Sequence, residues 1–512
     1  MNEIFGHLAT GFSVALTPLN LLIAAIGAFI GTIVGVLPGL GPINGVAILM
    51  PLAFAMQLPP ESSLILLAAV YIGCEYGGRI SSILINVPGE ASAIMTALDG
   101  YPMARQGKAG VALSISAWSS FVGSAVATVG IAIAAPLLAR WALAFGPAEY
   151  FALMVFAFCC LAGLMGEQPV KALLAAAVGL ALSTVGIDEN SGIYRYTFDS
   201  LHLSDGIQFV VVVIGLFSVS EMLLLLEQSV TGTAAVKPTG RTLFNLREMA
   251  QTWWGTVRGS LIGFVVGVLP GAGATVASAM AYSTEKRLVE QSDPEGAHFG
   301  KGDIRGLASP EAANNASATG SFVPMLTLGV PGSGTTAVMM GVLALYNITP
   351  GPALFDQRPE IVWGLIASLF IGNFMLLAMN IPMVGLFARM LSVPTWALVP
   401  FIVTVSAIGV YSVHATTFDL VMMVALGVVG YLLRKMSVPM APLILGLVLG
   451  NMMEQNLRRA LSITNGDTAI LWESPVSIGL WACAAAVLVV PVTLRALARR
   501  RGGAAVSSAP SA

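Results

Sequence analysis

Apolar stretches of membrane-spanning length follow one another along almost the whole chain. Only 10% of the 512 residues are charged and 56% are hydrophobic, whereas a soluble domain carries about 25% charged residues. A stretch of about 17–25 apolar residues is long enough to cross a bilayer as a helix. The sequence therefore predicts an all-α polytopic membrane protein with about 11–14 membrane-embedded elements.

Two short phrases occur twice in the chain, in the same order. "GVLPGLG" at residues 35–41 returns as "GVLPGAG" at 267–273, and "SSILINVPGEAS" at 81–92 is matched by "PMLTLGVPGSGT" at 324–335. Matching order and spacing indicate an internal duplication. The predicted organisation is a first repeat half at 1–230, a cytoplasmic connector at 231–258, a second repeat half at 259–495, and a disordered tail of basic and small residues at 496–512.

The repeated phrases place Pro and Gly inside apolar segments, where they interrupt helices. Each interruption is expected to give a broken helix or a re-entrant hairpin. Backbone groups freed in this way are tolerated in a membrane only against protein or a water-filled cavity. The start of the resuming helix suits an anion, and the end of the preceding helix offers carbonyl groups to a cation. Paired broken helices in duplicated halves are typical of secondary transporters.

The candidate substrate- and ion-binding residues are small or polar and lie in or beside these four phrases, with one more in "SPEAANN" at 309–315. They are Pro38, Gly39, Gly41, Asn44, Asn86, Pro88, Gly89, Ser92, Pro270, Gly271, Gly273, Thr275, Asn314, Pro331, Gly332, Ser333, Gly334, Thr335 and Thr336. A sodium site is expected, if present, among the same residues. The alternative for each residue is that small side chains only allow close helix packing in the membrane.

Three charged residues lie inside or beside the apolar segments of the first half, where charge is costly and suggests function. Glu75 and Arg79 are four residues apart, so they are expected to pair on one helix face. Arg79 is also a candidate ligand for a substrate carboxylate, because its guanidinium suits bidentate binding. Glu90 follows Pro88–Gly89 and is expected to cap a helix start.

The second half offers two further charged sites. Ser309, Pro310 and Glu311 resemble the first residues of a helix, with a capping hydroxyl, an early proline and an acidic first turn. Glu454 lies in "NMMEQNLRRAL" beside Arg458 and Arg459, so an ion pair at the membrane interface is expected.

Loop charges predict orientation, because basic loops stay in the cytoplasm. Arg105 and Lys108 place one loop inside, the acidic loop 188–205 is outside, and the mixed loop 284–305 is inside. Residues 258–283 then begin and end on one side with "GVLPGAG" between, which favours a hairpin. The alternative is that loop 284–305 lies outside.

Several classes of protein are disfavoured. The net charge of −2 gives no basic surface for nucleic acid, and the four cysteines lack metal-site spacing. None of the four histidines stands beside a G-x-S-x-G phrase, so an intramembrane enzyme is not expected. A passive channel or a membrane scaffold remains the alternative to a transporter.

The ordered motifs from about residue 27 to 465 resemble those of one known family. They include "YGGRISSILINVPGEASAIMTALDGYPMARQGKAG", "SPEAANNASATGS" and "GYLLRKMSVPMAPLILGLVLGNMMEQNLRRAL". They are similar to the TctA-type permease, the large membrane subunit of the tripartite tricarboxylate transporters.

The resemblance implies cation-coupled secondary uptake of tricarboxylates or related carboxylates, by alternating access, in a multi-pass protein of the bacterial inner membrane. It implies two protein partners, a small TctB-type membrane subunit and a periplasmic TctC-type substrate-binding protein. It implies no cofactor, with sodium or protons as the coupling ion. The absence of a G-x-x-x-x-G-K-[ST] phosphate loop agrees with coupling that does not use ATP.

Overall fold

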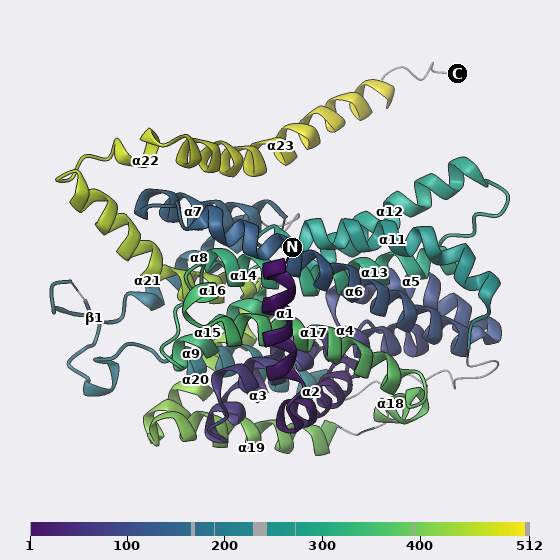
Figure 1. Ribbon diagram of the computed structural model, residues 1–512, viewed down its shortest axis with the longest axis horizontal. Coiled ribbons are helices and arrows are strands. Elements are labelled where there is room, and N and C mark those ends of the chain that lie inside the picture. The colour runs from purple at the N-terminus through teal and green to yellow at the C-terminus, as the bar shows by residue number, and fades with distance from the viewer. Residues whose placement is uncertain are drawn as a thin grey trace.

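The computed structural model describes residues 2–164, 169–188, 190–228, 243–271, 273–391, 393 and 395–506. Within these ranges the only strands are β1 (Gly186–Ile187) and β2 (Tyr194–Arg195), which pair antiparallel, and helices form most of the rest (Figure 1). Among the described residues, 6 helices are long and apolar enough to cross a membrane, and shorter apolar helices of 10–17 residues accompany them. The prediction of an all-α polytopic membrane protein is confirmed.

The helices before residue 230 are α1 (Asn2–Ala15), α2 (Pro18–Val36), α3 (Gly41–Ala55), α4 (Pro60–Ile85), η1 (Ala91–Ala93), α5 (Ile94–Met103), η2 (Ala104–Lys108), α6 (Ala109–Ala142), α7 (Pro147–Leu164), α8 (Pro169–Ser183), η3 (Leu201–Leu203), α9 (Phe209–Val213), η4 (Ile214–Val219) and α10 (Ser220–Gln228).

The helices after residue 242 are α11 (Leu246–Val268), α12 (Gly273–Ser292), α13 (Ile304–Gly320), α14 (Phe322–Leu328), α15 (Gly334–Leu345), α16 (Leu354–Gln357), α17 (Pro359–Asn380), α18 (Val384–Met390), α19 (Thr395–His414), α20 (Thr417–Lys435), α21 (Met440–Ile463), α22 (Ile470–Glu473) and α23 (Pro475–Val506).

The internal repeat is visible in the backbone. Helices α2, α3 and α4 correspond to α11, α12 and the α13–α14 pair, and each series ends at a V-P-G break. The residues that end the first helix of each series, Leu37 and Leu269, have φ/ψ of −77/116° and −78/122°. The residues before the helix that follows each V-P-G break, Glu90 and Ser333, have −147/164° and −148/168°. Such agreement shows that the two sequences fold the same way locally.

Glycines fix the closest helix contacts in both halves. In α2, Gly27, Gly31 and Gly35 lie where a Cβ atom would come within 2.7, 2.4 and 2.1 Å of carbonyl oxygens of α4. In α11, Gly259, Gly263 and Gly267 meet carbonyl oxygens of α13 in the same way, at 2.3, 2.3 and 2.4 Å. Only a residue without a side chain lets two membrane helices approach so closely. These glycines therefore explain why the α2–α4 and α11–α13 pairs are the tightest units of the fold.

The predicted hairpin at 258–283 is formed. Helices α11 and α12 run in opposite directions on either side of the break, and Arg258 of α11 contacts Glu285 of α12 at 2.8 Å. The side of the membrane that this hairpin enters stays a prediction.

The predicted domain boundaries stay predictions. Within the predicted connector at 231–258, α11 begins at Leu246, where Asn245 and Glu248 form a capping box; residues 231–242 lie outside the described residues. Within the predicted tail at 496–512, α23 continues to Val506; residues 507–512 lie outside the described residues.

The two halves also exchange a helix. Helix α6 follows the first repeat but packs on the second, where Gly123 meets the Ala312 carbonyl of α13. Helix α17 follows the second repeat but packs on the first, where Asn373 accepts a 2.8 Å hydrogen bond from the Tyr76 hydroxyl of α4. Neither half is a separate body, because each needs a helix from the other.

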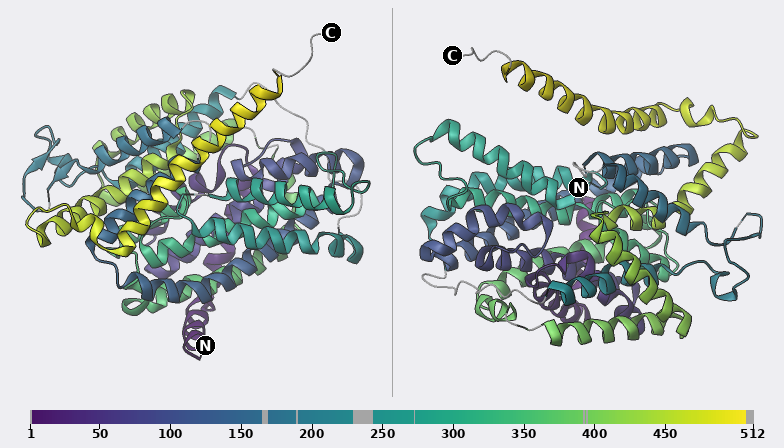
Figure 2. Two further views of the ribbon diagram at one scale, coloured as in Figure 1. Left: turned by 90° about the horizontal axis from the view of Figure 1, so that it is seen from above. Right: turned by 180° about the vertical axis from the view of Figure 1, so that it is seen from behind.

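The two ends of the molecule differ in character. The β1–β2 hairpin projects at one end, whereas the turn between α12 and α13 and the end of α23 lie at the opposite end (Figures 1 and 2). The amide of Gln106, in η2, donates to the Lys301 carbonyl at 2.8 Å, so two loops predicted to be cytoplasmic are neighbours. This arrangement agrees with the predicted orientation, which stays a prediction because no membrane is present.

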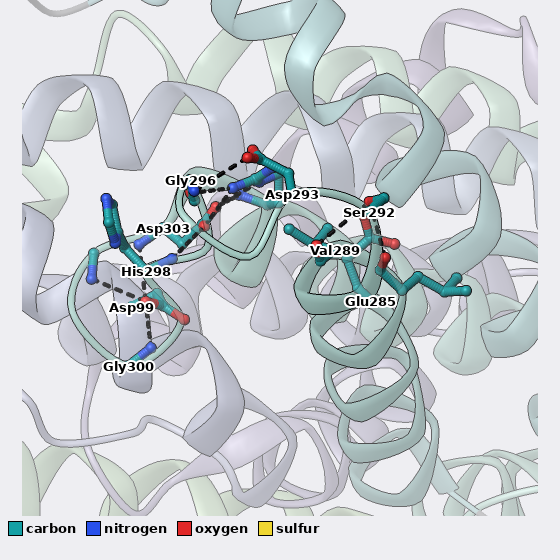
Figure 3. Close-up of polar contacts among 12 residues, drawn as sticks. Asp99, Glu285, Val289, Ser292, Asp293, Gly296, His298, Gly300 and Asp303 are labelled. Atoms are coloured by element: carbon teal, nitrogen blue, oxygen red, sulfur yellow. Dashed lines mark hydrogen bonds and ion pairs between the residues drawn. The ribbon is translucent and has the colours of Figure 1, made fainter.

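The charged loop after α12 is anchored on one buried carboxylate. Asp99 of α5 accepts hydrogen bonds from the backbone N–H groups of Gly300 and Asp303 at 2.8 and 2.9 Å (Figure 3). It also accepts hydrogen bonds from the Gly302 N–H at 2.9 Å and from the Tyr282 hydroxyl at 3.0 Å. A carboxylate of α5 therefore holds the backbone of this loop in place.

The start predicted at Ser309 is wrong, because α13 begins at Ile304 with Asp303 as its cap. Pro310 thus lies inside the helix. Ser309 instead donates to the Ala281 carbonyl at 3.4 Å, and Glu311 is fully buried. A Ser-Pro-Glu sequence fits both a helix start and a buried helix interior, which is why the sequence alone misplaced it.

We expect Gly35→Ala and Gly267→Ala to destabilise the protein by similar amounts, about 1–3 kcal/mol each. The added methyl group would stand 2.1 Å from the Cys74 oxygen or 2.4 Å from the Ser317 oxygen. Thermal unfolding of the purified protein in detergent measures the effect. Gly372→Ala in α17 is the matched control, because nothing lies within 4 Å of its added methyl group. Unchanged unfolding in the first two variants would contradict the close approach.

We expect Asp99→Ala to release the 293–303 loop, because three backbone donors lose a charged acceptor, at a cost of about 1.5–3 kcal/mol for each hydrogen bond. Trypsin should then cleave after Lys301 faster than in the wild-type protein. Asp356→Ala, which removes an exposed carboxylate of α16, is the control. Equal cleavage of both variants would show that Asp99 does not anchor the loop.

Candidate substrate cavity

The four broken segments meet at one cavity of about 670 Å³. The first break and α3 contribute residues 39–44, the second contributes 88–92, the third contributes Ala274 and Thr275, and the fourth contributes 333–335. Helix α4, η4 and the α20–α21 connection complete the wall, with Tyr71, Glu75, Phe217, Arg434 and residues 438–441. Segments that lie more than 200 residues apart in sequence therefore share one polar space.

Glycine is required at the first and third breaks because the backbone there is left-handed. Gly39 and Gly271 have φ of 86° and 77°, values that other L-residues rarely adopt. The freed backbone groups find partners inside the protein. The Gly271 N–H donates to the Gly332 carbonyl at 3.0 Å, and the Asn44 amide donates to the Gly39 and Leu40 carbonyls. The breaks thus satisfy one another, as membrane burial demands.

Four helix starts face the cavity. The wall includes the first or second residue of α3 (Gly41), η1 (Ala91), α12 (Ala274) and α15 (Gly334), and η1 continues directly into α5. The first N–H groups of a helix have no partner within the helix, and they carry about half a positive charge together. The cavity is therefore surrounded by hydrogen-bond donors and positive dipole ends, which favour an anion.

Two hydrogen bonds join the halves across the cavity. The residues that form them occupy equivalent positions in the two repeats. The Tyr71 hydroxyl of α4 lies 3.2 Å from the Ser333 hydroxyl, and the Asn314 amide of α13 donates to Glu90 at 3.1 Å. At the repeat offset of 243 residues, Tyr71 is equivalent to Asn314 and Glu90 is equivalent to Ser333. The same structural positions therefore hold both halves together, with different side chains.

Three ionisable side chains of the cavity wall carry its charge. Arg434 of α20 forms an ion pair with the buried Glu221 of α10, and its guanidinium lies 5.8 Å from the centre of the Phe217 ring. Glu75, which is 2% exposed, and the partly exposed Glu90 are the acidic residues. Arg434 is the one guanidinium among the described residues that line this space.

The sequence-predicted site residues divide into two groups. Those that line the cavity are Gly39, Gly41, Asn44, Pro88, Gly89, Ser92, Thr275, Ser333, Gly334 and Thr335. Those that shape the breaks without lining it are Pro38, Asn86, Pro270, Gly271, Gly273, Asn314, Pro331, Gly332 and Thr336. Binding of a substrate or an ion by any of them stays a prediction.

Arg79 lies outside the cavity wall. Its guanidinium donates to Asn380 of α17 at 3.2 Å, lies 4.8 Å from the centre of the Tyr76 ring, and interacts electrostatically with Glu311. The expected pair with Glu75 is not formed, because Glu75 interacts with Glu90 whereas the Arg79 guanidinium is turned towards Asn380. The second proposal for Arg79, direct contact with a substrate carboxylate, is not supported by this position.

Part of the cavity wall is not predictable from the sequence motifs. Tyr71 gave no signal beyond a polar group in an apolar helix, and Arg434 lies in "YLLRKMSVP", outside the repeated phrases. Glu90 was expected to cap a helix, but its side chain makes no capping bond to η1 and instead accepts from Asn314. Glu75 and Glu90 could be recognised from the sequence because they are charged residues inside or beside apolar segments.

A second cavity of about 750 Å³ lies beside the β1–β2 hairpin. Asp188, Arg195 and Glu454 are among the residues that line it. Glu454 contacts Arg195 at 2.8 Å and Arg458 at 2.6 Å, which confirms the expected ion pair with Arg458. The backbone N–H of Asn190 and the Arg458 guanidinium lower the pKa of Asp188 to about 2. This charge network attaches the hairpin to α21.

These features define a multi-pass helical membrane protein with a polar cavity built from broken helices of two repeated halves. The sequence matches the Tripartite tricarboxylate transporter TctA family over residues 21–445, and the chain belongs to this family. This is a family of membrane permeases, the large subunits of three-part transporters, and not a family of enzymes.

Two relatives come from Agrobacterium vitis. One, described as an uncharacterized 52.8 kDa protein in the TAR-I ttuC' 3' region, is 42% identical over 490 residues, which cover 96% of each chain. The other, an uncharacterized protein in the TAR-II ttuC' 3' region, is 43% identical over 218 residues, which cover 43% of this chain and 88% of the relative. No solved structure matches this chain.

We expect a cysteine at Ser92 or Thr275, on the cavity wall, to react with a charged thiol reagent roughly 10-fold faster than a cysteine at Thr327, because reaction needs water and an ionised thiol. Thr327 is fully buried outside the wall. The variants are made in a background without the 4 native cysteines, and labelling is followed by mass spectrometry. Equal rates at all three positions would argue against a hydrated cavity.

Proposed function

We propose that this chain is the permease through which tricarboxylates or related carboxylates enter the cell, driven by a cation gradient. The single observation that carries the proposal is the meeting of four helix starts and Arg434 at one cavity. Helix starts supply N–H donors and positive dipole ends, and a guanidinium matches the geometry of a carboxylate. Membership of the TctA family supports the same substrate class.

Alternating access is proposed as the mechanism. Broken helices at the interface of two repeats are typical of transporters in which one part moves against another around a fixed site. Here the cavity beside the breaks at residues 37–40, 86–90, 269–271 and 329–333 is the proposed site. The coupling ion is sodium or a proton, and no cofactor is needed.

The proposed assembly has three parts. A periplasmic TctC-type protein delivers the carboxylate, a small TctB-type membrane subunit accompanies the permease, and the location is the bacterial inner membrane. The family is one of three-part transporters, which supports membrane partners.

The test is uptake of radiolabelled citrate and a panel of dicarboxylates into vesicles that contain the three proteins. An inward sodium gradient and an inward proton gradient are applied separately. Accumulation of one carboxylate under either gradient supports the proposal. No accumulation of any carboxylate under both gradients would overturn it.

Arg434→Gln should raise the KM for the transported carboxylate about 10–100-fold, because a charge-assisted hydrogen bond contributes about 1.5–3 kcal/mol. Arg434→Gln alone leaves Glu221 buried without its partner. The KM of the Glu221→Gln variant is therefore compared with that of the double variant, in which residues 221 and 434 are both neutral. Glu221→Gln alone should keep a KM near that of the wild type. Equal KM values for Glu221→Gln and the double variant would exclude Arg434 as a substrate ligand.

A further inference from the structure

Two acidic side chains lie together in the cavity wall. Glu75 comes from α4 and Glu90 from the segment before η1; both line the same cavity, and they interact electrostatically with each other. The Asn314 amide of the second half donates to Glu90 at 3.1 Å. One oxygen of Glu75, Oε2, has no hydrogen-bond partner although the side chain is only 2% exposed. The pair is therefore incompletely satisfied by the protein itself.

Two neighbouring carboxyl groups shielded from water are stable together only when they share a proton or a metal cation. A carboxyl group donates a hydrogen bond only when it is protonated, and two carboxylates in contact repel each other strongly away from water. The pair is thus expected to hold one proton or one metal cation at any time when it is shielded from water.

The neighbouring groups do not neutralise this negative charge. Tyr71 and Cys74 of α4 face the pair and are neutral when protonated. Glu311 of α13 adds a third acid, and Arg79 interacts with Glu311. Across the cavity, Arg434 is already paired with Glu221. Two buried acids and the partly exposed Glu90 therefore face one nearby guanidinium, and a proton on the pair reduces the imbalance.

The repeat shows that neither acid is needed to form the fold. Ser333 occupies the position equivalent to Glu90 with the same backbone conformation, and it caps α15 through its hydroxyl. Glu90 makes no such capping bond. The position equivalent to Glu75 is Ala318, 243 residues later. The acids are thus an addition to one half, at the surface that faces the substrate cavity.

We propose that Glu75 and Glu90 together bind the proton that drives uptake, an inference that rests on the proposed cation-coupled transport. The proton passes from external water through the cavity to the carboxylate pair, and it leaves to internal water when the cavity opens inward. Because the pair and the helix starts line one space, a deprotonated pair repels an incoming carboxylate. Proton and substrate therefore favour each other's binding, and the linkage is reciprocal. At an effective dielectric constant near 20, one added charge in such a space changes affinity by roughly 10-fold.

The test separates coupling from binding in the full three-part transporter reconstituted in vesicles. Citrate is the first probe, replaced by whichever dicarboxylate the wild type accumulates. Exchange of labelled substrate across the membrane without a gradient is measured for Glu75→Gln and Glu90→Gln, and accumulation is expressed relative to that exchange. The ratio of proton-driven accumulation to exchange should fall by roughly 10-fold or more in both variants, because the amide carries no titrating charge. Glu285→Gln is the matched control, a buried glutamate of α12 outside the cavity wall that should keep both activities.

Accumulation by both variants at the wild-type level under a proton gradient would overturn the proposal. So would a wild-type protein that accumulates substrate only under a sodium gradient, because the pair would then hold sodium or no coupling ion.

A second measurement uses the wild-type protein and does not depend on the folding of a variant. Addition of substrate to the purified transporter in weakly buffered detergent solution should cause proton uptake, seen with a pH-indicator dye. No proton uptake despite substrate binding would overturn the coupling role of the pair while leaving the transport function intact. Absence of carboxylate binding and of uptake under every gradient would instead overturn the proposed function.

Discussion

The fold depends on one constraint, that backbone groups freed by a broken helix must find partners away from lipid. Four such breaks occur, and each is placed against another break or against a polar side chain. Gly271 donates to Gly332, and the Asn44 amide caps the carbonyl groups of the first break. The polar cavity forms where the breaks meet. Its hydrogen-bond donors are the backbone N–H groups that have no partner within a helix.

The sequence predicted this arrangement where the physical signal was local. Gly and Pro inside apolar segments identify breaks, and recurrence at a fixed spacing identifies the duplication. The antiparallel α11–α12 hairpin followed from loop charge and a central Pro–Gly. These features do not depend on which distant segments become neighbours, so a single sequence can reveal them.

Long-range contacts were not predictable in the same way. Spacing placed Glu75 beside Arg79, but helix packing turned Arg79 towards Asn380 and brought Glu75 to Glu90 from the next segment. Arg434 reaches the cavity from a helix outside both repeated phrases. Ser309–Pro310–Glu311 also fits a helix start, but Asp303 caps α13 six residues earlier and Ser309 donates to Ala281 of α12. Helix packing, and not local preference, decided the positions of Glu75, Arg79 and Arg434.

The exchange of α6 and α17 restricts how the cavity can open. Each half is held by a helix that belongs, along the chain, to the other, so the halves cannot swing apart as two rigid bodies without separating Gly123 from Ala312 and Tyr76 from Asn373. The wall formed by Arg434 and the start of α21 contains neither of these two contacts. A displacement of that wall alone therefore leaves both contacts between the halves in place, whereas a separation of the halves breaks them.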